Sequence, residues 1–386
     1  PDLHTRGTFP SPNDTMINVS HLIDIIFDEN ATASELLTLV AAIAVFWAAF
    51  FYLFGLILRP MVYGKPWLIA AGERDYERGG KELYEQLGIA KTKDEFVDTF
   101  MDLWPWNQAV YVQHFVGGML CVPAIFGLAD EGTASSLACL GILSEMGWEI
   151  EDMATWLYKR FCHPDGKVKV PNELLILLII HHSMTTLLGM PMVLHYRNLR
   201  TLHWLCFDLQ IAGAVALSVQ EYTKLLEITE RRQLFQFQLL TSFALVVMIV
   251  TRGLHWVYLC ADLISMWYHE KAWVFLGVGS VISLLFSFFN WFFCIEPFYK
   301  RFAKFVKVSA EYKKLPADAD SKKRRSSVVV LEAAAAEVLG RQQVEEEILS
   351  LFAERKVKRR GTMPPSMFGS KGRRRASVVL LRSSVG

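Results

Sequence analysis

Long runs of apolar residues recur along the chain and are separated by short polar stretches. A transmembrane helix needs about 20 mainly apolar residues, and the clearest runs of that length are 36–58, 174–194, 235–261 and 273–297. Weaker runs cover 108–129, 135–158 and 203–222. The run at 135–158 carries too many carboxylates to qualify by hydropathy alone, but its neighbours need a return crossing, and bundle interiors admit polar groups. The pattern therefore predicts an all-α, polytopic membrane protein with seven transmembrane helices.

The composition agrees with this pattern and adds a charge asymmetry. Of the 386 residues, 52% are hydrophobic and only 20% are charged, whereas soluble domains carry about 25% charged residues. These values exclude a disordered chain, a collagen-like repeat and a disulfide-rich secreted module. Residues 1–299 hold 19 Lys or Arg against 30 Asp or Glu, while residues 300–386 hold 21 against 9. The net charge of +1 therefore combines an acidic body with a basic tail.

Two features predict the orientation in the membrane. The glycosylation sequons begin at Asn13, Asn18 and Asn30, all before the first span, and no sequon follows. Each loop assigned to the cytosol holds more Lys and Arg than its lumenal neighbours, as the positive-inside rule requires. We therefore expect an integral membrane protein of the endoplasmic reticulum with a lumenal N-terminus and a cytosolic C-terminus.

These signals divide the chain into five parts. They are a lumenal N-terminal segment with sequons (1–35), a first transmembrane helix (36–58), a cytosolic loop (59–107), a six-helix membrane domain (108–298) and a basic cytosolic tail (299–386). The cytosolic loop mixes acidic and basic residues densely, and we expect a short amphipathic helix within it.

The predicted spans contain many polar and ionisable residues. A charged side chain at membrane depth costs about 2.5–3.5 kcal/mol on insertion scales, so each is by default a candidate for function. The candidates are His114, Glu145, Glu149, Asp152, His181, His182, Asp208, Glu221, Arg252, His255 and Asn290. The spacing of Glu145, Glu149 and Asp152 places them on one helix face. The alternative is structural: these residues pair with one another and hold the bundle together, with Arg252 bound to a carboxylate.

Two adjacent histidines are the first candidates for catalysis. His181 and His182 point about 100° apart on a helix, so one is expected to face the polar interior while the other braces it. At 1.5 Å per residue, His181 and Asp208 lie roughly 14 Å and 21 Å from the cytosolic ends of their spans. A neutral imidazole near a carboxylate is the usual arrangement of a general base. His181, His182 and Asp208 are therefore candidate catalytic residues that could take a proton from an amine or hydroxyl nucleophile.

Other histidine and cysteine chemistry lacks its sequence motifs. The ten histidines form none of the HxxxH or HxxHH boxes of membrane di-iron enzymes, and 273–297 contains no lysine for a retinal Schiff base. The six cysteines form no CxxC pair and suit buried apolar positions. His114 and His182 lie in two different spans and could in principle both bind a haem iron, but no haem-binding motif is present. From the sequence we assign no metal site and no bound cofactor.

The chain resembles the TLC-domain family, which includes the ceramide synthases. Residues 181–185 are similar to the HHxxT element of that family, and Asp208 falls where the family has its following aspartate. The predicted topology is also similar: a lumenal N-terminus with sequons and one leading helix, then six helices that the family closes into a barrel around a lipid cavity. The resemblance covers roughly 105–300.

The resemblance implies N-acyl transfer from acyl-CoA, as co-substrate, to a long-chain (sphingoid) amine. His182 or His181 would deprotonate the amine, and Asp208 would orient the imidazole. The substrate-binding candidates are Glu145, Glu149, Asp152, Glu221, Arg252, His255 and Asn290. Ceramide synthases carry a second aspartate where this chain has Ile211. That departure favours the alternative, a non-catalytic TLC protein that binds or senses membrane lipids or escorts cargo.

The basic tail contains a local repeat. Both Ser327 and Ser377 follow an Arg-Arg-x pattern that basophilic kinases accept, and a helix is expected over 331–355. Phosphorylation would add about −1.5 to −2 charge at each serine and weaken attraction to anionic lipid, whereas the alternative is a tail that binds lipid unmodified. The expected partners are therefore membrane lipids, acyl-CoA and a kinase, with no nucleic acid; a homodimer stays open.

Overall fold

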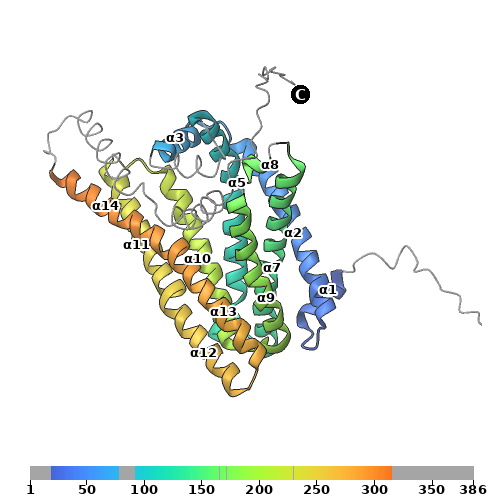
Figure 1. The fold of residues 1–386 in the computed structure, drawn as a ribbon. Helices are drawn as coiled ribbons and strands as arrows, with labels where there is room; N and C mark the ends of the chain where they lie inside the picture. The colour runs from blue at the N-terminus through green and yellow to red at the C-terminus, as the bar shows by residue number, and fades with distance from the viewer. Residues whose placement is uncertain (1–18, 78–91, 165, 171, 229, 315–386) are drawn as a thin grey trace, which may run out of the picture. The chain divides into compact units, whose positions relative to one another are not determined.

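Helices form every regular element in the described part of the chain, which confirms the all-α prediction for that part (Figure 1). The computed structural model describes residues 19–77, 92–164, 166–170, 172–228 and 230–314. The predicted glycosylation sites Asn13 and Asn18, the predicted phosphorylation sites Ser327 and Ser377, and the predicted tail helix at 331–355 lie outside these ranges.

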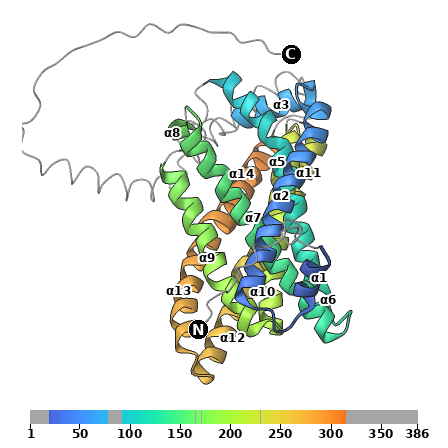
Figure 2. The same ribbon diagram turned by 90° about the vertical axis from the view of Figure 1, so that its right-hand side faces the viewer.

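Long helical rods run alongside one another through the described residues (Figures 1 and 2). Five rods are single α-helices: α2 (Ala33–Val62), α5 (Lys93–Leu120), α7 (Glu131–Cys162), α9 (Asn172–Tyr196) and α10 (Arg200–Leu225). Two more are each interrupted by a π-helical segment: α11 (Arg231–Met248), η3 (Ile249–His255) and α12 (Trp256–His269), then α13 (Trp273–Phe289), η4 (Asn290–Ile295) and α14 (Glu296–Lys314). Short helices lie near the ends of the rods: α1 (Val19–Phe27), α3 (Pro66–Asp75), α6 (Val122–Phe126) and α8 (Gly166–Lys169).

Six helical segments of the described chain are long and apolar enough to cross a membrane, by length and composition. They are Ala33–Val62, Lys93–Phe126, Leu174–Tyr196, Arg200–Leu225, Arg231–His269 and Trp273–Lys307. Five of them contain a predicted span in full, and Lys93–Phe126 overlaps the predicted span 108–129 but ends at Phe126. The remaining predicted span, 135–158, is helical as part of α7, but its carboxylates keep α7 out of this set. The seventh crossing therefore stays a prediction.

The predicted cytosolic loop at 59–107 is much more helical than expected. It holds α3, which matches the predicted short helix, and it also holds the first half of α5. Thr92 caps α5, because its Oγ1 accepts a hydrogen bond of 3.2 Å from the backbone N–H of Glu95. Phe96 in the first turn of α5 is buried in one apolar cluster with Leu68 of α3. This packing against α3 explains why the helix begins so far before its apolar run.

The helices after α2 contact one another in a closed circle. Along this circle, α5 packs on α7, α7 on α9, α9 on α13, α13 on α12, α14 on α11, α11 on α10, and α10 on α5. Helix α10 also contacts α7 and α12, so the circle is flattened rather than round. Helix α2 packs outside the circle, against α5 and α7. The polar residues on the facing sides of α7 and α9 are thereby brought together.

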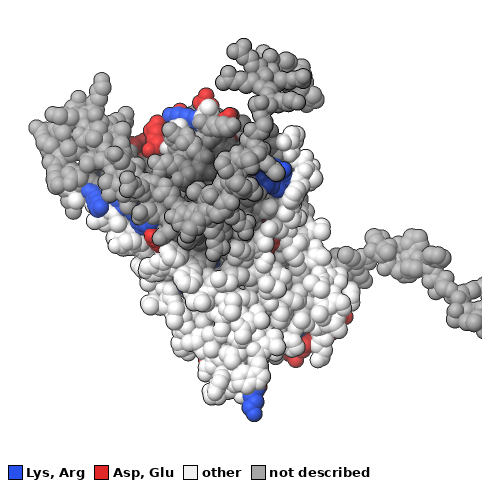
Figure 3. Space-filling view, in the orientation of Figure 1, with Lys and Arg blue, Asp and Glu red and all other residues white. Residues whose placement is uncertain are grey.

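Charged residues gather at the two ends of the rods. On the face shown in Figure 3, an uncharged band separates Lys, Arg, Asp and Glu near the end with α3 from a few charges at the opposite end. Many large apolar side chains point outward between the ends; for example, Val45 and Leu53 of α2 are exposed. An apolar outer surface of this kind is what a lipid bilayer requires.

Small residues let α5, α7 and α10 approach one another closely. A Cβ atom built on Gly141 of α7 would lie 2.6 Å from the backbone oxygen of Gly117 in α5. The side chain of Gln210 from α10 lies against Gly117, and its Nε2 donates a 3.0 Å hydrogen bond to the Gly141 oxygen. Close approach at small residues is the usual way in which membrane helices associate. Three helices are therefore in contact at one point.

We expect Gly141→Ala to destabilise the protein by about 1–3 kcal/mol, the range for overpacking a filled interior. The added methyl group meets backbone, which cannot rotate away as a side chain can. The measurement is the thermal unfolding temperature of the purified protein in detergent. Gly55→Ala in α2 is the matched control, because no atom lies within 4 Å of the added Cβ there. Equal unfolding temperatures for the two variants would contradict the close α5–α7 contact.

Candidate functional site in the helix interior

Helix α7 carries three carboxylates into the interior of the helix circle. Glu145, Glu149 and Asp152 share one face of the helix, as their spacing predicts. Glu149 is 2% exposed and Asp152 is 3% exposed. Because buried carboxylates must be paired or hydrogen-bonded, their neighbours define the site.

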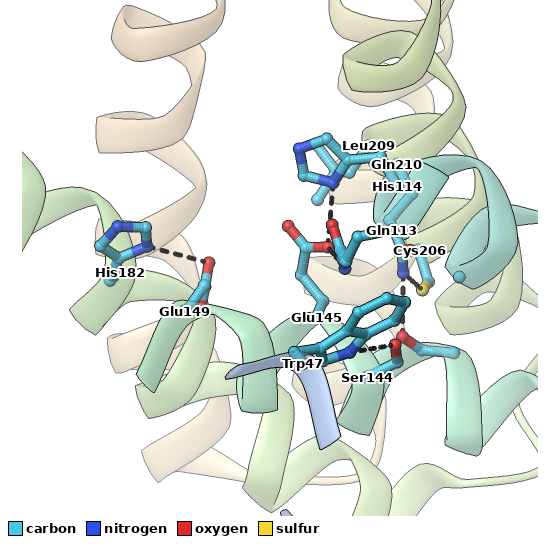
Figure 4. A network of polar contacts seen from close by, with 12 residues as sticks. Trp47, Gln113, His114, Ser144, Glu145, Glu149, His182, Cys206, Leu209 and Gln210 are labelled. Carbon is cyan, nitrogen blue, oxygen red and sulfur yellow. Dashed lines mark hydrogen bonds and ion pairs between the residues drawn. The ribbon is translucent and has the colours of Figure 1, made fainter. Parts of the chain in front are cut away.

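His182 of α9 lies between two of these carboxylates. Its Nε2 is 3.0 Å from Asp152 Oδ2, and its Nδ1 is 3.7 Å from Glu149 Oε1. Asp152 is held from its own helix, since Trp156 Nε1 donates a 2.9 Å hydrogen bond to Asp152 Oδ1. Figure 4 shows the His182 ring facing Glu149 across the gap between the two helices. His182 therefore faces the polar interior with both of its ring nitrogens.

His181 takes the bracing position that the sequence predicts for one of the two histidines. Its ring stacks on Phe289 of α13, with ring centroids 4.4 Å apart and planes 9° apart. The His181 and His182 ring centroids are 5.2 Å apart. The pair therefore connects the carboxylates of α7 to the last membrane-length rod.

Glu145 pairs with α5, not with α9. His114 Nδ1 lies 3.2 Å from Glu145 Oε2, and Gln113 Nε2 donates a 2.9 Å hydrogen bond to the same oxygen (Figure 4). The Trp148 ring lies edge-on to both His114 and His182, with centroids 4.9 Å and 5.7 Å away. The carboxylates of α7 thus contact His114 of α5 and His182 of α9. The ring of Trp148 lies between these two histidines.

Asp208 does not orient His181 or His182 as the sequence analysis expected. Its Oδ2 lies 2.6 Å from Nδ1 of His255, which belongs to η3. The pair is at the edge of the interior, because the side chain of His255 is 30% exposed while that of Asp208 is 5% exposed. The expectation failed because depth along two spans says nothing about which faces of the helices meet.

Arg252 is also paired differently from the prediction. It donates hydrogen bonds to Asn290 Oδ1 of η4, at 3.1 Å, and to the backbone oxygen of Leu209, so neither contact is with a carboxylate. Both η3 and η4 are π-helical and they contact each other. Such segments are frequent at functional sites, and neither was predicted, because hydropathy patterns do not distinguish π from α turns.

Two other predicted residues lie apart from this interior cluster. Glu221, near the end of α10, accepts hydrogen bonds from Asn107 Nδ2 at 2.9 Å and Lys224 Nζ at 2.6 Å. Asn30 is exposed just before α2, where Thr32 forms a capping box with Glu35. Glu221 thus joins α10 to the middle of α5, and Asn30 is accessible for modification.

Several residues of the cluster were missed in the sequence. Gln113, Trp156 and Phe289 contact the ionisable side chains directly. Glutamine and aromatic residues inside a span carry no charge, so a search for ionisable groups passes over them. Trp156 could have been found from its spacing, since it lies one helical turn after Asp152.

We expect Arg252→Lys to lower the free energy of unfolding by about 1.5–3 kcal/mol, the usual value for hydrogen bonds to a charged group. A lysine ammonium is a compact point charge, whereas the arginine fork reaches η4 and α10 together. Thermal unfolding in detergent measures the loss. Arg232→Lys, at the exposed start of α11, is the matched control; an equally small effect of both variants would mean that Arg252 does not join the two rods.

No protein-family model, curated protein or solved structure matches this chain.

Proposed function

We propose that the chain is a TLC-type membrane protein with seven spans, in which α2 leads and six rods form a barrel. The closed circle of helix contacts supports the barrel. Helix α7 has 32 residues, about 48 Å at 1.5 Å per residue, which exceeds the bilayer core of about 30 Å. Its carboxylates at 149 and 152 are buried, while Ile150, Tyr158 and Phe161 are exposed. Helix α7 is therefore polar inward and apolar outward, as a crossing helix within a barrel would be.

We further propose a lumenal N-terminus and a cytosolic C-terminus in the endoplasmic reticulum membrane. The sequon at Asn30 lies at the start of α2, which supports a lumenal position for that end. Lys300, Arg301, Lys304 and Lys307 continue from the last rod in α14, at the end that also holds α3 (Figure 1). A basic helix end is typical of the cytosolic side.

The proposed activity is transfer of a fatty acyl group from acyl-CoA to a long-chain amine. It rests on the pair of Asp208 and His255. The carboxylate holds Nδ1 of the imidazole at 2.6 Å, and no described residue forms a hydrogen bond with Nε2. A histidine held in this way is arranged as a general base. This pair replaces His181 and His182 as the base that the sequence suggested.

Acyl transfer at the Asp208–His255 pair needs no reagent other than the amine and acyl-CoA. His255 Nε2 takes a proton from the amine nitrogen, which attacks the thioester carbonyl carbon. The C–N bond forms and the C–S bond breaks. The imidazolium then returns its proton to the coenzyme A thiolate, which leaves as the thiol, and the amide remains. Asp208 stabilises the imidazolium during the transfer.

The surroundings of His255 favour a lipid substrate. Leu254, Val257 and Tyr258 are exposed on the outer surface beside it, and the Tyr258 ring lies parallel to the His255 ring with centroids 6.0 Å apart. A long-chain amine in the bilayer could therefore approach Nε2 of His255 from within the plane of the membrane. Such access suits a substrate whose chain stays in the hydrocarbon while its amine enters a polar site.

The orientation and the seventh crossing are tested by cysteine labelling. Cys162 at the end of α7 is exposed, whereas the other cysteines are buried or half-buried. We expect a membrane-impermeant maleimide to label Cys162 in sealed microsomes with the cytosolic face outward. In a Cys162→Ser background, Leu128→Cys between α6 and α7 should react only after permeabilisation. Labelling of both positions without permeabilisation would show that α7 does not cross.

The activity is tested with membranes from cells that lack their own ceramide synthases, supplied with acyl-CoA and sphingoid base. We expect His255→Ala to slow amide formation about 100-fold or more, the usual size of a general-base effect, and Asp208→Asn to act in the same direction. His269→Ala, exposed at the end of the same rod, is the matched control. No amide above background for the native chain would refute acyl transfer and favour the alternative, lipid binding without catalysis.

A further inference from the structure

Three side chains from α7 and α9 converge in the interior of the helix circle. Glu149, His181 and His182 each offer one ligand atom, and these atoms all lie within 4.8 Å of one another. We infer that Glu149, His181 and His182 form a binding site for one divalent cation of the zinc class.

Among the described residues, three donor atoms of this group have no hydrogen-bond partner, and the atom that lies 3.7 Å from His182 Nδ1 is Glu149 Oε1, which belongs to another proposed ligand. In the described part of the chain, Glu149 Oε2, His181 Nδ1 and His182 Nδ1 are buried and have no hydrogen-bond partner. More than nine in ten buried polar groups in proteins are satisfied, and an unsatisfied one costs about 1–3 kcal/mol. The three unpaired atoms belong to the side chains whose ligand atoms lie within 4.8 Å of one another, and one shared cation would satisfy them.

The surroundings of His182 have the form of a metal ligand's support. Its Nε2 lies 3.0 Å from Asp152 Oδ2, which leaves Nδ1 free to bind a cation. Histidine ligands almost always donate their second nitrogen to a carboxylate or carbonyl in this way. Asp152 is itself fixed by the 2.9 Å hydrogen bond from Trp156 Nε1. Both the ligand and its supporting carboxylate are thus already oriented.

The local charge also calls for a cation. Glu149 and Asp152 flank His182, and both carboxylates are almost fully buried. One protonated imidazole could balance only one of two ionised carboxylates, whereas a divalent cation balances both. Uncompensated charge in a low-dielectric interior is strongly unfavourable. A bound cation therefore resolves the excess of negative charge and the unpaired donors together.

The ligand set suits zinc or a similar ion. Two imidazole nitrogens and one carboxylate form a common catalytic zinc set, in which the fourth position takes water or substrate. With metal–ligand bonds of about 2.0–2.2 Å, tetrahedral donors lie about 3.4 Å apart. His182 Nδ1 and Glu149 Oε1 are 3.7 Å apart, which is close to this spacing.

This inference goes beyond the proposed acyl transfer and does not depend on it. It gives His181 and His182 a role other than the general base, because a nitrogen bound to a cation accepts no proton. The Asp208–His255 pair uses none of the three ligands. Metal content is measured without substrate, so a failure of the acyl-transfer assay would leave this result untouched.

The test is the metal content of the full chain, purified in lipid nanodiscs through a tag without histidine and without chelators. We expect close to one zinc-class ion per chain by plasma mass spectrometry. Glu149→Gln and His182→Gln should abolish it, and added Co²⁺ should give a four-coordinate visible spectrum in the native chain only. The matched controls keep the metal: Glu151→Gln, half-buried on the same helix α7, and His195→Gln, exposed on α9.

If the ligand variants fold poorly, the Zn²⁺ affinity of an Asp152→Asn variant and the unfolding temperature of the native chain test the same site. Asp152→Asn keeps all three ligands, and we expect it to weaken Zn²⁺ binding about 10–100-fold, as loss of a supporting carboxylate does. Chelation should lower the unfolding temperature of the native chain, and Zn²⁺ should restore it. A native chain without metal whose unfolding temperature does not respond to Zn²⁺ or Co²⁺ would overturn the inference. In that case His182 is an imidazolium between two carboxylates.

Discussion

The interior of this molecule is organised by the need to satisfy the carboxylates of one helix away from water. Helix α7 lies between α5 and α9, and its inner face is acidic at each turn. Glu145 is satisfied from α5 and Asp152 from α9, so the rotation and height of both neighbours are fixed relative to α7. Apolar contacts between helices could not fix rotation and height in this way, because Leu and Ile side chains can repack when one helix shifts along another. A buried carboxylate loses its hydrogen bonds when its neighbour shifts. The polar interior is thus a positional constraint as well as a candidate site.

The sequence was most informative where the signal is local. Apolar runs of membrane length identified the rods, and the spacing of the α7 carboxylates identified their common face. It failed where the answer depends on how helices rotate against one another. Asp208 and His181 have comparable depths, yet Asp208 faces η3 and His181 faces Phe289 of α13. The depth of a residue in the membrane follows from counting residues along one helix. A contact also depends on how each of the two helices is rotated about its own axis, and the hydropathy pattern determines that rotation only coarsely.

Two histidine arrangements with different chemistry share one interior. His182 has carboxylates at both ring nitrogens, which suits a cation site and makes it a poor acceptor of protons from a substrate. His255 has one carboxylate, at Nδ1, and its side chain is 30% exposed. The stack of His181 on Phe289, next to Asn290 and so to Arg252, links the two arrangements through side chains in contact. Burial and the number of carboxylates, more than residue type, separate their roles.

The two π-helical segments, η3 and η4, determine what a one-residue insertion or deletion would do to the rods that contain them. A π turn holds one residue more than an α turn, and each residue of an α-helix advances the direction of its side chain by about 100°. The residue gained in η3 therefore sets the direction of every side chain in α12, and the one in η4 sets those of α14. Deleting one residue within either segment would restore regular α-helix and turn the rest of that rod about its axis. Because Arg252 of η3 donates a hydrogen bond to Asn290 of η4, such a deletion in one segment would also disturb its contact with the other.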